Sequence, residues 1–188
     1  MSRIGFALCG SFCTHAAALT ALEALLACGH DIQPILSETA FATDTRFGCA
    51  AALRERLESL CGRAVIHTVP EAEPLGPARP LDALVICPCT GNTLAKLANG
   101  VTDSAVTMAA KAHLRSDRPL LVSLASNDAM SANLCNIGIL LPRKSVFFVP
   151  LRQDDPARKP HSLVADFSLV PSALSAALAG RQLRPLFL

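Results

Sequence analysis

Three short loops rich in Gly, Ser, Thr and Asn follow apolar segments of this 188-residue sequence. They read GSFCT (10–14), SET (37–39) and PCTGNT (88–93). Residues of these types expose backbone N–H groups and hydroxyls, and a helix that begins there adds a partial positive charge, so such loops bind phosphate well. Ordinary turns and helix caps favour the same residue types. A phosphate pocket is the better interpretation if all three loops meet at one edge of a sheet.

Common nucleotide-binding motifs are absent from the first loop. It lacks the Gly-Lys-Ser/Thr of a Walker A motif, and Gly10 alone does not supply the pattern Gly-x-Gly-x-x-Gly. No acidic residue ends the apolar segment 31–37, where a dinucleotide ribose would need one. The sequence therefore disfavours ordinary dinucleotide binding by this chain.

The cysteines and histidines form no recognisable metal motif. Cys87 and Cys89 flank a single proline, but a tetrahedral zinc site needs four ligands and no second close pair exists. We expect no metal site and no structural disulfide, with Cys87 in the core and Cys89 in a loop near the pocket. His15 lies nearest to the first loop, and we expect it to be exposed at the start of a helix.

Short apolar runs alternate with longer helical segments. The strands and helices that these segments form determine where the three loops lie. Runs typical of strands span 3–9, 31–37, 64–67, 81–87, 119–124 and 145–150. Helices are predicted at 14–28, 49–61, 92–98, 104–114, 129–140 and from 171 to Gly180. The alternation predicts one α/β domain over 1–188, a three-layer, doubly wound and mainly parallel sheet of the Rossmann or flavodoxin-like kind.

Two irregular stretches, 37–48 and 151–162, interrupt this series. Loops of that length inside a compact domain are usually functional or form interfaces. We therefore expect them to contribute to subunit contacts or to a flap over the site.

Composition narrows the class of protein. The sequence is 51% hydrophobic, against about 45–50% in ordinary globular proteins, so it can build a sizeable core. The net charge is +2 and both Trp and Tyr are absent, which disfavours nucleic-acid binding. No run approaches the ~18 apolar residues of a membrane span, and the N-terminus does not resemble a signal peptide. We expect a soluble, cytoplasmic protein.

Two segments carry a resemblance to a known family. The segment CPCTGNTLAKLANGVTDS (87–104) resembles the signature Pro-x-Ser-Ala-Asn-Thr-x-x-Lys-x-Ala-x-Gly-x-x-Asp of the homo-oligomeric flavin-containing decarboxylases, a flavoprotein family. The segment ALCGSFCTH (7–15) resembles the family's flavin-phosphate loop. The resemblance implies FMN bound at a subunit interface, in a homo-oligomer built on trimers. By matching position, it assigns the phosphate to Gly10 and Ser11, the ribityl chain to Ser37, and the ring and ribityl chain to Pro88, Thr90, Gly91, Asn92 and Thr93.

Three further segments, TDTRFG (43–48), AEPLGP (72–77) and FFVPLRQDDPARKPHSLVA (147–165), are similar to one branch of this family. Members of that branch act in spore formation, where dihydrodipicolinate is oxidised to the dicarboxylate dipicolinate. NADP is held there by a separate A subunit. The resemblance implies the same partner for this chain. Two carboxylates need cations, and Arg46, Lys96 and Lys111 are the candidates to bind them. We also expect Asn92 to act in turnover and Asn127 to contact the substrate.

Departures from the family pattern disfavour decarboxylation. The decarboxylases carry a His shortly before the fourth strand, where this chain reads AEPLGPARPLD. Their Pro-Ala-Met-Asn segment after the fifth strand is replaced by Ala-Ser-Asn-Asp at 125–128, and the Ala of their signature is Gly91. Two alternatives stay open: an autonomous FMN-dependent decarboxylase of a peptidyl-cysteine type, and a non-catalytic scaffold subunit.

Overall fold

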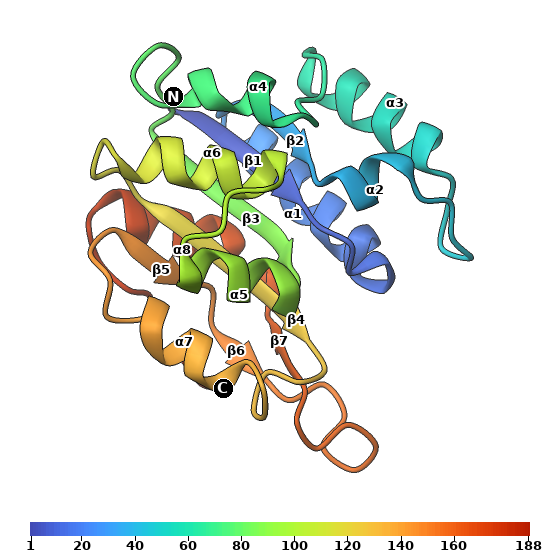
Figure 1. The fold of residues 1–188 in the computed structure, drawn as a ribbon, viewed down its shortest axis with the longest axis vertical. Helices are drawn as coiled ribbons and strands as arrows, with labels where there is room; N and C mark the ends of the chain where they lie inside the picture. The colour runs from blue at the N-terminus through green and yellow to red at the C-terminus, as the bar shows by residue number, and fades with distance from the viewer.

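The computed structural model describes residues 1–188 and contains one mixed, seven-stranded sheet (Figure 1). Its strands are β1 Arg3–Leu8, β2 Asp31–Leu36, β3 Ala83–Cys89, β4 Leu120–Ser126, β5 Val146–Phe148, β6 Leu151–Arg152 and β7 Leu163–Ala165. The order β2-β1-β3-β4 is entirely parallel. β5 continues the parallel sheet beside the first half of β4, whereas the β6–β7 hairpin joins its second half antiparallel.

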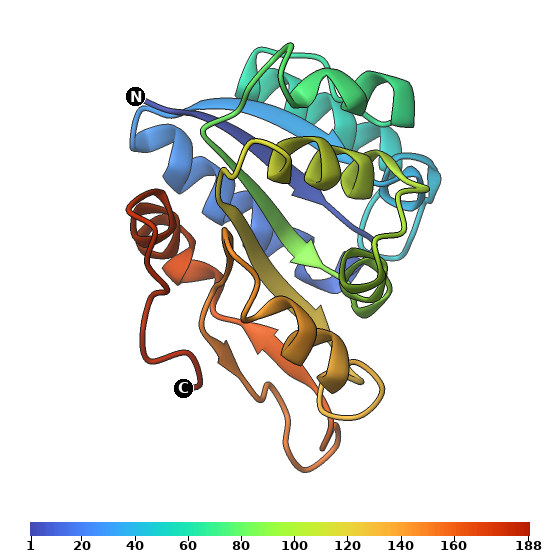
Figure 2. The same cartoon turned by 60° about the vertical axis from the view of Figure 1, so that its left-hand side comes forward.

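Helices cover both faces of this sheet (Figure 2). One face carries α1 His15–Ala27 and α8 Val170–Leu178, which contact each other. The other carries α4 Val69–Ala72, α5 Gly91–Asn99, α6 Ala105–Leu114 and α7 Leu134–Leu140. Beside β2 lie α2 Glu38–Ala42 and α3 Ala50–Cys61, and single 3-10 turns occur at η1 Phe12–Thr14, η2 Glu73–Leu75 and η3 Phe167–Leu169. The predicted three-layer, mainly parallel α/β fold is confirmed.

The central strands explain why the sequence forms a covered parallel sheet. Every residue of β3 and β4 is buried, so these strands are apolar on both faces rather than alternating. A single cluster of buried side chains joins the sheet to the helices on both sides. Gly62 and Gly100 adopt left-handed conformations and end α3 and α5, as glycine after a helix commonly does. No helix is both long enough and apolar enough to cross a lipid bilayer.

Several sequence-based boundaries were wrong, each for a local reason. The segment 64–67 forms no strand beyond one bridge between Ile66 and Ile35, because the Gln33 amide takes the Ala64 carbonyl and a capping box starts α4 directly afterwards. The helix predicted at 129–140 begins only at Leu134, since hydrogen-bonded turns occupy the residues before it. The two irregular stretches contain α2 and β6.

Gly76, the glycine of the segment AEPLGP (72–77), has a structural role. It follows η2 and lies directly under α6, where a Cβ at this position would come within 2.8 Å of the Ala112 carbonyl oxygen. Only glycine permits this close approach of two backbones. The glycine of AEPLGP therefore fixes how tightly the connection to β3 packs against α6.

His113 makes the free energy of unfolding depend on pH. Its side chain is 1% exposed, and its Nε2–H donates to the Pro119 carbonyl at 2.9 Å, while the buried Nδ1 has no partner. Burial lowers the pKa of His113 below its ordinary value of 6.5, because it keeps the charged imidazolium away from water.

We expect the protein to lose stability as the pH falls below about 6.5. The unfolded chain then binds a proton that the folded chain does not, so the free energy of unfolding decreases by at most about 1.4 kcal/mol per pH unit for this group. The loss levels off once the pH passes the lowered folded-state pKa. Urea unfolding between pH 5 and 8 should show a shallower slope for His113→Gln than for the parent; equal slopes would contradict this origin.

Candidate functional site

The carboxyl ends of four adjacent parallel strands meet at one edge of the sheet. They belong to β2, β1, β3 and β4, and are followed by Ser37, by the loop that starts near Gly10, by Thr90 and by Asn127. Ligands of open α/β sheets bind at this edge. The expected convergence of Gly10, Ser37 and Thr90 is therefore confirmed by the strand order.

The loop after β1 is held by internal hydrogen bonds, yet it leaves polar groups free. The hydroxyl and the N–H of Thr14 both donate to the Ser11 carbonyl, at 2.8 and 3.0 Å. The His15 ring donates from Nε2 to the Cys9 carbonyl at 2.8 Å and is half-buried, so the expectation of an exposed side chain was wrong. The backbone N–H groups of Gly10 and Ser11 and the Ser11 hydroxyl make no hydrogen bond within the chain.

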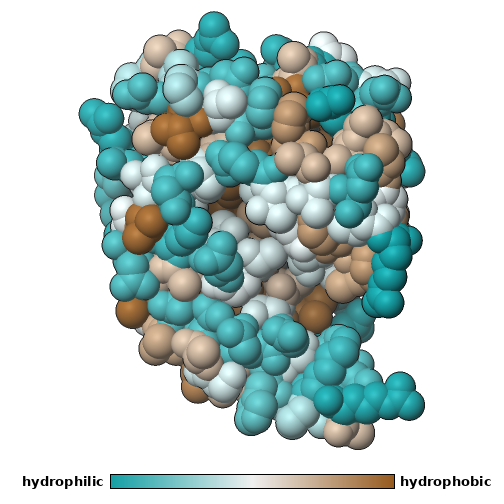
Figure 3. Space-filling model, turned by 45° about the vertical axis from the view of Figure 1, so that its right-hand side comes forward, coloured by the Kyte–Doolittle hydropathy of each residue, from teal (hydrophilic) through white to brown (hydrophobic).

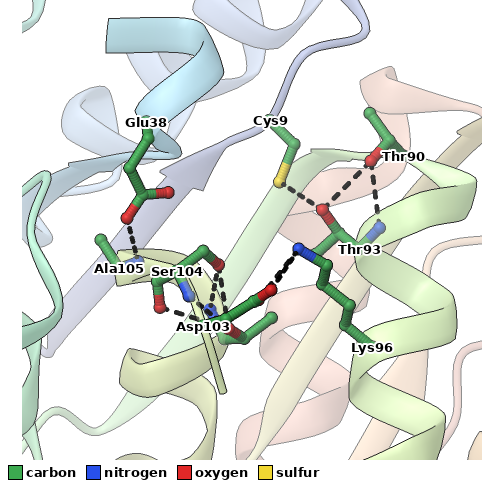
Figure 4. Close-up of polar contacts among 9 residues, drawn as sticks. Cys9, Glu38, Thr90, Thr93, Lys96, Asp103, Ser104 and Ala105 are labelled. Atoms are coloured by element: carbon green, nitrogen blue, oxygen red, sulfur yellow. Dashed lines mark hydrogen bonds and ion pairs between the residues drawn. The ribbon is translucent and has the colours of Figure 1, made fainter. Parts of the chain in front are cut away.

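The turn from β3 into α5 starts with a cis peptide at Pro88. Hydroxyl groups hold the residues that follow (Figure 4). Thr90 caps α5 by accepting the Thr93 N–H at 3.2 Å. The Thr93 hydroxyl points at β1 and donates to the Cys9 sulfur at 3.3 Å, so it ties the two strand ends together. Asn92, one position earlier in α5, is exposed and its side-chain amide has no partner in the chain.

A second feature of the turn is a polar cluster packed on Gly91. After β4, the Ser126 hydroxyl donates to the Asp128 carboxylate, which also accepts from the Asn133 amide at 2.9 and 3.0 Å. The Ser126 bond, with that of Asn133, lowers the pKa of Asp128 below its ordinary value. A Cβ on Gly91 would lie 2.6 Å from both Ser126 Oγ and Asn133 Nδ2. Glycine is therefore what allows this cluster to sit against the start of α5.

These loops enclose a polar cavity of about 460 Å³ together with the β6–β7 hairpin. The hairpin loop contributes Asp154, Lys159 and Ser162, and Lys159 pairs with Asp154 at 2.9 Å. The Met130 N–H donates to the His161 carbonyl, which holds the hairpin against the loop after β4. Figure 3 is turned toward the side on which the strands end, and it shows hydrophilic residues around a hollowed, paler centre.

The structure brings some of the predicted site residues together and separates others. Those that line the polar cavity are Ser11, Thr90, Gly91, Asn92 and Asn127. Those that do not line it are Gly10, Ser37, Arg46, Pro88, Thr93 and Lys96.

Other groups in the chain already engage most of the predicted residues that lie outside the cavity. The Ser37 hydroxyl caps α2 by accepting the Ala40 N–H. Arg46 is exposed and stacks on Phe47, 4.8 Å from its ring centre. Lys96 pairs with Asp103 at 2.9 Å, so the Lys and Asp of the signature segment hold the α5–α6 connection (Figure 4).

Sequence reasoning missed the residues that the cavity takes from distant segments. Cys13, Asp128 and the hairpin residues Asp154, Lys159 and Ser162 all line it. The unusual length of the stretch 151–162 was the available signal, but it did not indicate which side chains turn inward.

The three buried cysteines near the site, Cys9, Cys87 and Cys89, are not reactive thiolates. All eight cysteines are free, and no group of three or more His, Cys, Asp or Glu is arranged to hold a metal ion. Cys89 is fully buried at the end of β3, so its prediction as a loop thiol was wrong. Burial raises the pKa of Cys9 to about 11 and that of Cys87 to about 12, and it raises the pKa of Cys89 as well. All three remain protonated at neutral pH.

The donor set of the cavity suits a phosphate-bearing ligand such as FMN. The free N–H groups of Ser11, which lines the cavity, and of its neighbour Gly10 lie just before η1 and α1 and can hold phosphate oxygens. The unpartnered Ser11 hydroxyl and Asn92 amide add directional donors, and the volume lies within the range of about 300–1,000 Å³ for ligand pockets. Only three of the fourteen lining residues are hydrophobic, so this chain offers a ring few apolar side chains to stack on.

Comparison with known families and proteins identifies the family of this chain. A model of the Flavoprotein family matches residues 1–155. The B subunit of dipicolinate synthase from Bacillus subtilis (strain 168) is 44% identical over 184 residues, which cover 98% of this chain and 92% of that protein.

Solved structures show the same fold. The crystal structure of the dipicolinate synthase B subunit from Bacillus halodurans C is 39% identical, with a TM-score of 0.92 over 100% of this chain and 96% of that one. The FMN-dependent cysteine decarboxylase SpaF is 24% identical, with a TM-score of 0.69 over 95% and 96% of the two chains. The second similarity concerns the fold alone.

Proposed function

The chain belongs to the Flavoprotein family, and from that premise we propose that residues 1–188 form the FMN-binding component of a two-subunit oxidoreductase that makes dipicolinate during spore formation. The observation that carries this function is the polar cavity at the carboxyl edge of the sheet, with the free Ser11 and Asn92 side chains in its wall. The 44% identity to the B. subtilis dipicolinate synthase protein supports the choice of reaction.

The reaction removes two electrons and two protons from dihydrodipicolinate, which arises by dehydration of 4-hydroxytetrahydrodipicolinate, and leaves an aromatic ring. When bound, FMN supplies a two-electron acceptor at this site. The net oxidant is NADP, held by a separate A subunit. The lack of a dinucleotide fingerprint after β1 supports this division of labour.

The cavity's own residues bind and orient the two ligands. Ser11 and the neighbouring N–H groups hold the phosphate, because hydrogen bonds to charged groups are the strong ones. Asn92 and Asn127 offer amides to the ring or to the substrate carboxylates. Lys159 is the sole cation among the lining residues, and it could pair with a substrate carboxylate only by giving up its ion pair with Asp154.

We also propose the assembly in which this site works. The small number of hydrophobic residues in the lining supports a homo-oligomer built on trimers, in which a neighbouring copy of the chain completes the wall around the flavin ring. The A subunit docks on this assembly in the cytoplasm. Ser126 and Asp128 lie in the segment where the decarboxylases read Pro-Ala-Met-Asn. Their polar cluster with Asn133 disfavours an autonomous decarboxylase.

The test reconstitutes the enzyme from the purified chain and its A subunit. FMN binding is followed by fluorescence quenching, and dipicolinate formation is followed with NADP present. We expect FMN to bind this chain, and product to form only with both subunits and flavin. Product formation without any flavin would indicate a scaffold role, and turnover of a peptidyl-cysteine by this chain alone would indicate a decarboxylase.

Asn92→Ala separates binding from turnover in the same system. Its amide is free, so its removal should leave folding and phosphate affinity nearly unchanged. Dipicolinate formation should fall by at least roughly tenfold, the effect of losing about 1.4 kcal/mol of transition-state stabilisation. Asn99→Ala, at the far end of α5, is the control and should match the parent. An Asn92→Ala enzyme with parental turnover would remove this residue from the reaction.

A further inference from the structure

A second pocket, unrelated to the polar cavity, lies between the end of α5, the α5–α6 connection and α6. It encloses about 320 Å³ and shares no lining residue with the polar cavity. Four cationic side chains line it: Lys96, Lys111, Arg115 and Arg143. We call it the basic pocket.

The charges in the basic pocket are unbalanced. Its lining contains no carboxylate, and among its cations only Lys96 has an ion-pair partner, Asp103. Lys111, Arg115 and Arg143 have no carboxylate within 4.0 Å. Of the eight ion pairs in the protein, only the one between Lys96 and Asp103 involves a cation of the basic pocket. A set of like charges around one hollow repels itself, and an anion relieves that repulsion.

Parts of the basic pocket are held in place before any ligand arrives. The Arg143 guanidinium donates to the Leu97 carbonyl at 3.2 Å, and the Asp103 pair fixes Lys96. Gly100, with φ of 71°, turns the chain at the end of α5, and the Thr102 N–H has no partner within the chain. Positioned donors lose less conformational entropy on binding than free side chains do.

The remaining lining indicates the class of ligand. Leu97, Val101, Ala110 and Leu114 supply an apolar wall between the cations. A bare phosphate would leave that wall unused, whereas a small organic molecule with two carboxylates would contact both parts. We propose that the basic pocket binds a small organic dicarboxylate, at a site separate from the one assigned to FMN and substrate.

The test measures binding of benzene-1,3-dicarboxylate by calorimetry at low ionic strength, where exposed charges are least screened. Lys111 and Arg115 are exposed, so Lys111→Gln/Arg115→Gln should fold like the parent, which its thermal midpoint checks. We expect this variant to bind about tenfold more weakly, the effect of losing two exposed charge contacts. The matched control Arg79→Gln/Arg181→Gln removes two exposed, unpaired cations outside the pocket and should bind like the parent.

Three results would overturn the assignment. Equal weakening in both double variants would mean that only net charge matters, and no weakening in either would mean that the pocket does not bind the probe. Inorganic phosphate or hexaglutamate binding as tightly as the dicarboxylate would assign the pocket to another class of anion. FMN titration of the same variants should be unchanged, so this site and the proposed function can fail separately.

Discussion

Gly91→Ala is expected to destabilise the protein by about 3 kcal/mol and to open the polar cavity's wall, through overpacking and broken buried hydrogen bonds. The new methyl group would lie 2.6 Å from Ser126 Oγ and Asn133 Nδ2, and 2.9 Å from Asp128 Oδ1. None of the three can withdraw without losing its partner, because each is bonded to another member of the cluster. Urea unfolding measures the loss, and FMN titration measures the damage to the site.

A second substitution tests whether the cluster is the cause. The related decarboxylases have Ala at the positions of both Gly91 and Ser126. A methyl group at position 91 is therefore compatible with Ala, but not with Ser, at position 126. Gly91→Ala/Ser126→Ala should therefore recover part of the stability that Gly91→Ala loses, although Ser126→Ala alone removes a hydrogen bond. Additive losses in the double variant would show that Ser126 does not clash with the new methyl group.

Local sequence patterns predicted the fold, but they predicted only part of the candidate site. Strands β3 and β4 are buried on both faces, and continuous apolar runs indicate such strands from sequence alone. The loops that end β1 and β3 were found for the same reason, since Ser11, Thr90 and Asn92 directly follow those runs. Parallel strand order then brought them to one edge.

The surroundings of some side chains depend on contacts between distant segments, which the sequence did not reveal. Lys96 was expected at the substrate, but the α5–α6 connection brings Asp103 within 2.9 Å of it. Lys159 was missed because its position depends on the antiparallel pairing of β7 with β4, which two- and three-residue strands do not reveal. Spacing along the chain identifies a helix face, but it does not identify which side chain a later hairpin places in the cavity.

Ser11→Asp is expected to abolish FMN binding while leaving the fold intact. Ser11 precedes η1 and α1, a position where Asp is as favourable as Ser and where a negative charge suits the helix N-terminus. The thermal midpoint should therefore match or exceed that of the parent. The carboxylate would repel the flavin phosphate and replace a hydrogen-bond donor, which together cost about 4 kcal/mol, or roughly a thousandfold in Kd.

Two further variants show whether the loss arises at this loop. Ser11→Ala removes the hydroxyl without adding charge, so it should weaken FMN binding by only about 1.5 kcal/mol, or roughly tenfold. Thr20→Asp adds the same charge to the exposed side of α1 and should bind FMN like the parent. We expect the Kd for FMN, measured by fluorescence quenching, to increase in the order Thr20→Asp, Ser11→Ala, Ser11→Asp. If Ser11→Asp binds FMN as the parent does, the phosphate lies elsewhere and the loop after β1 is an ordinary turn.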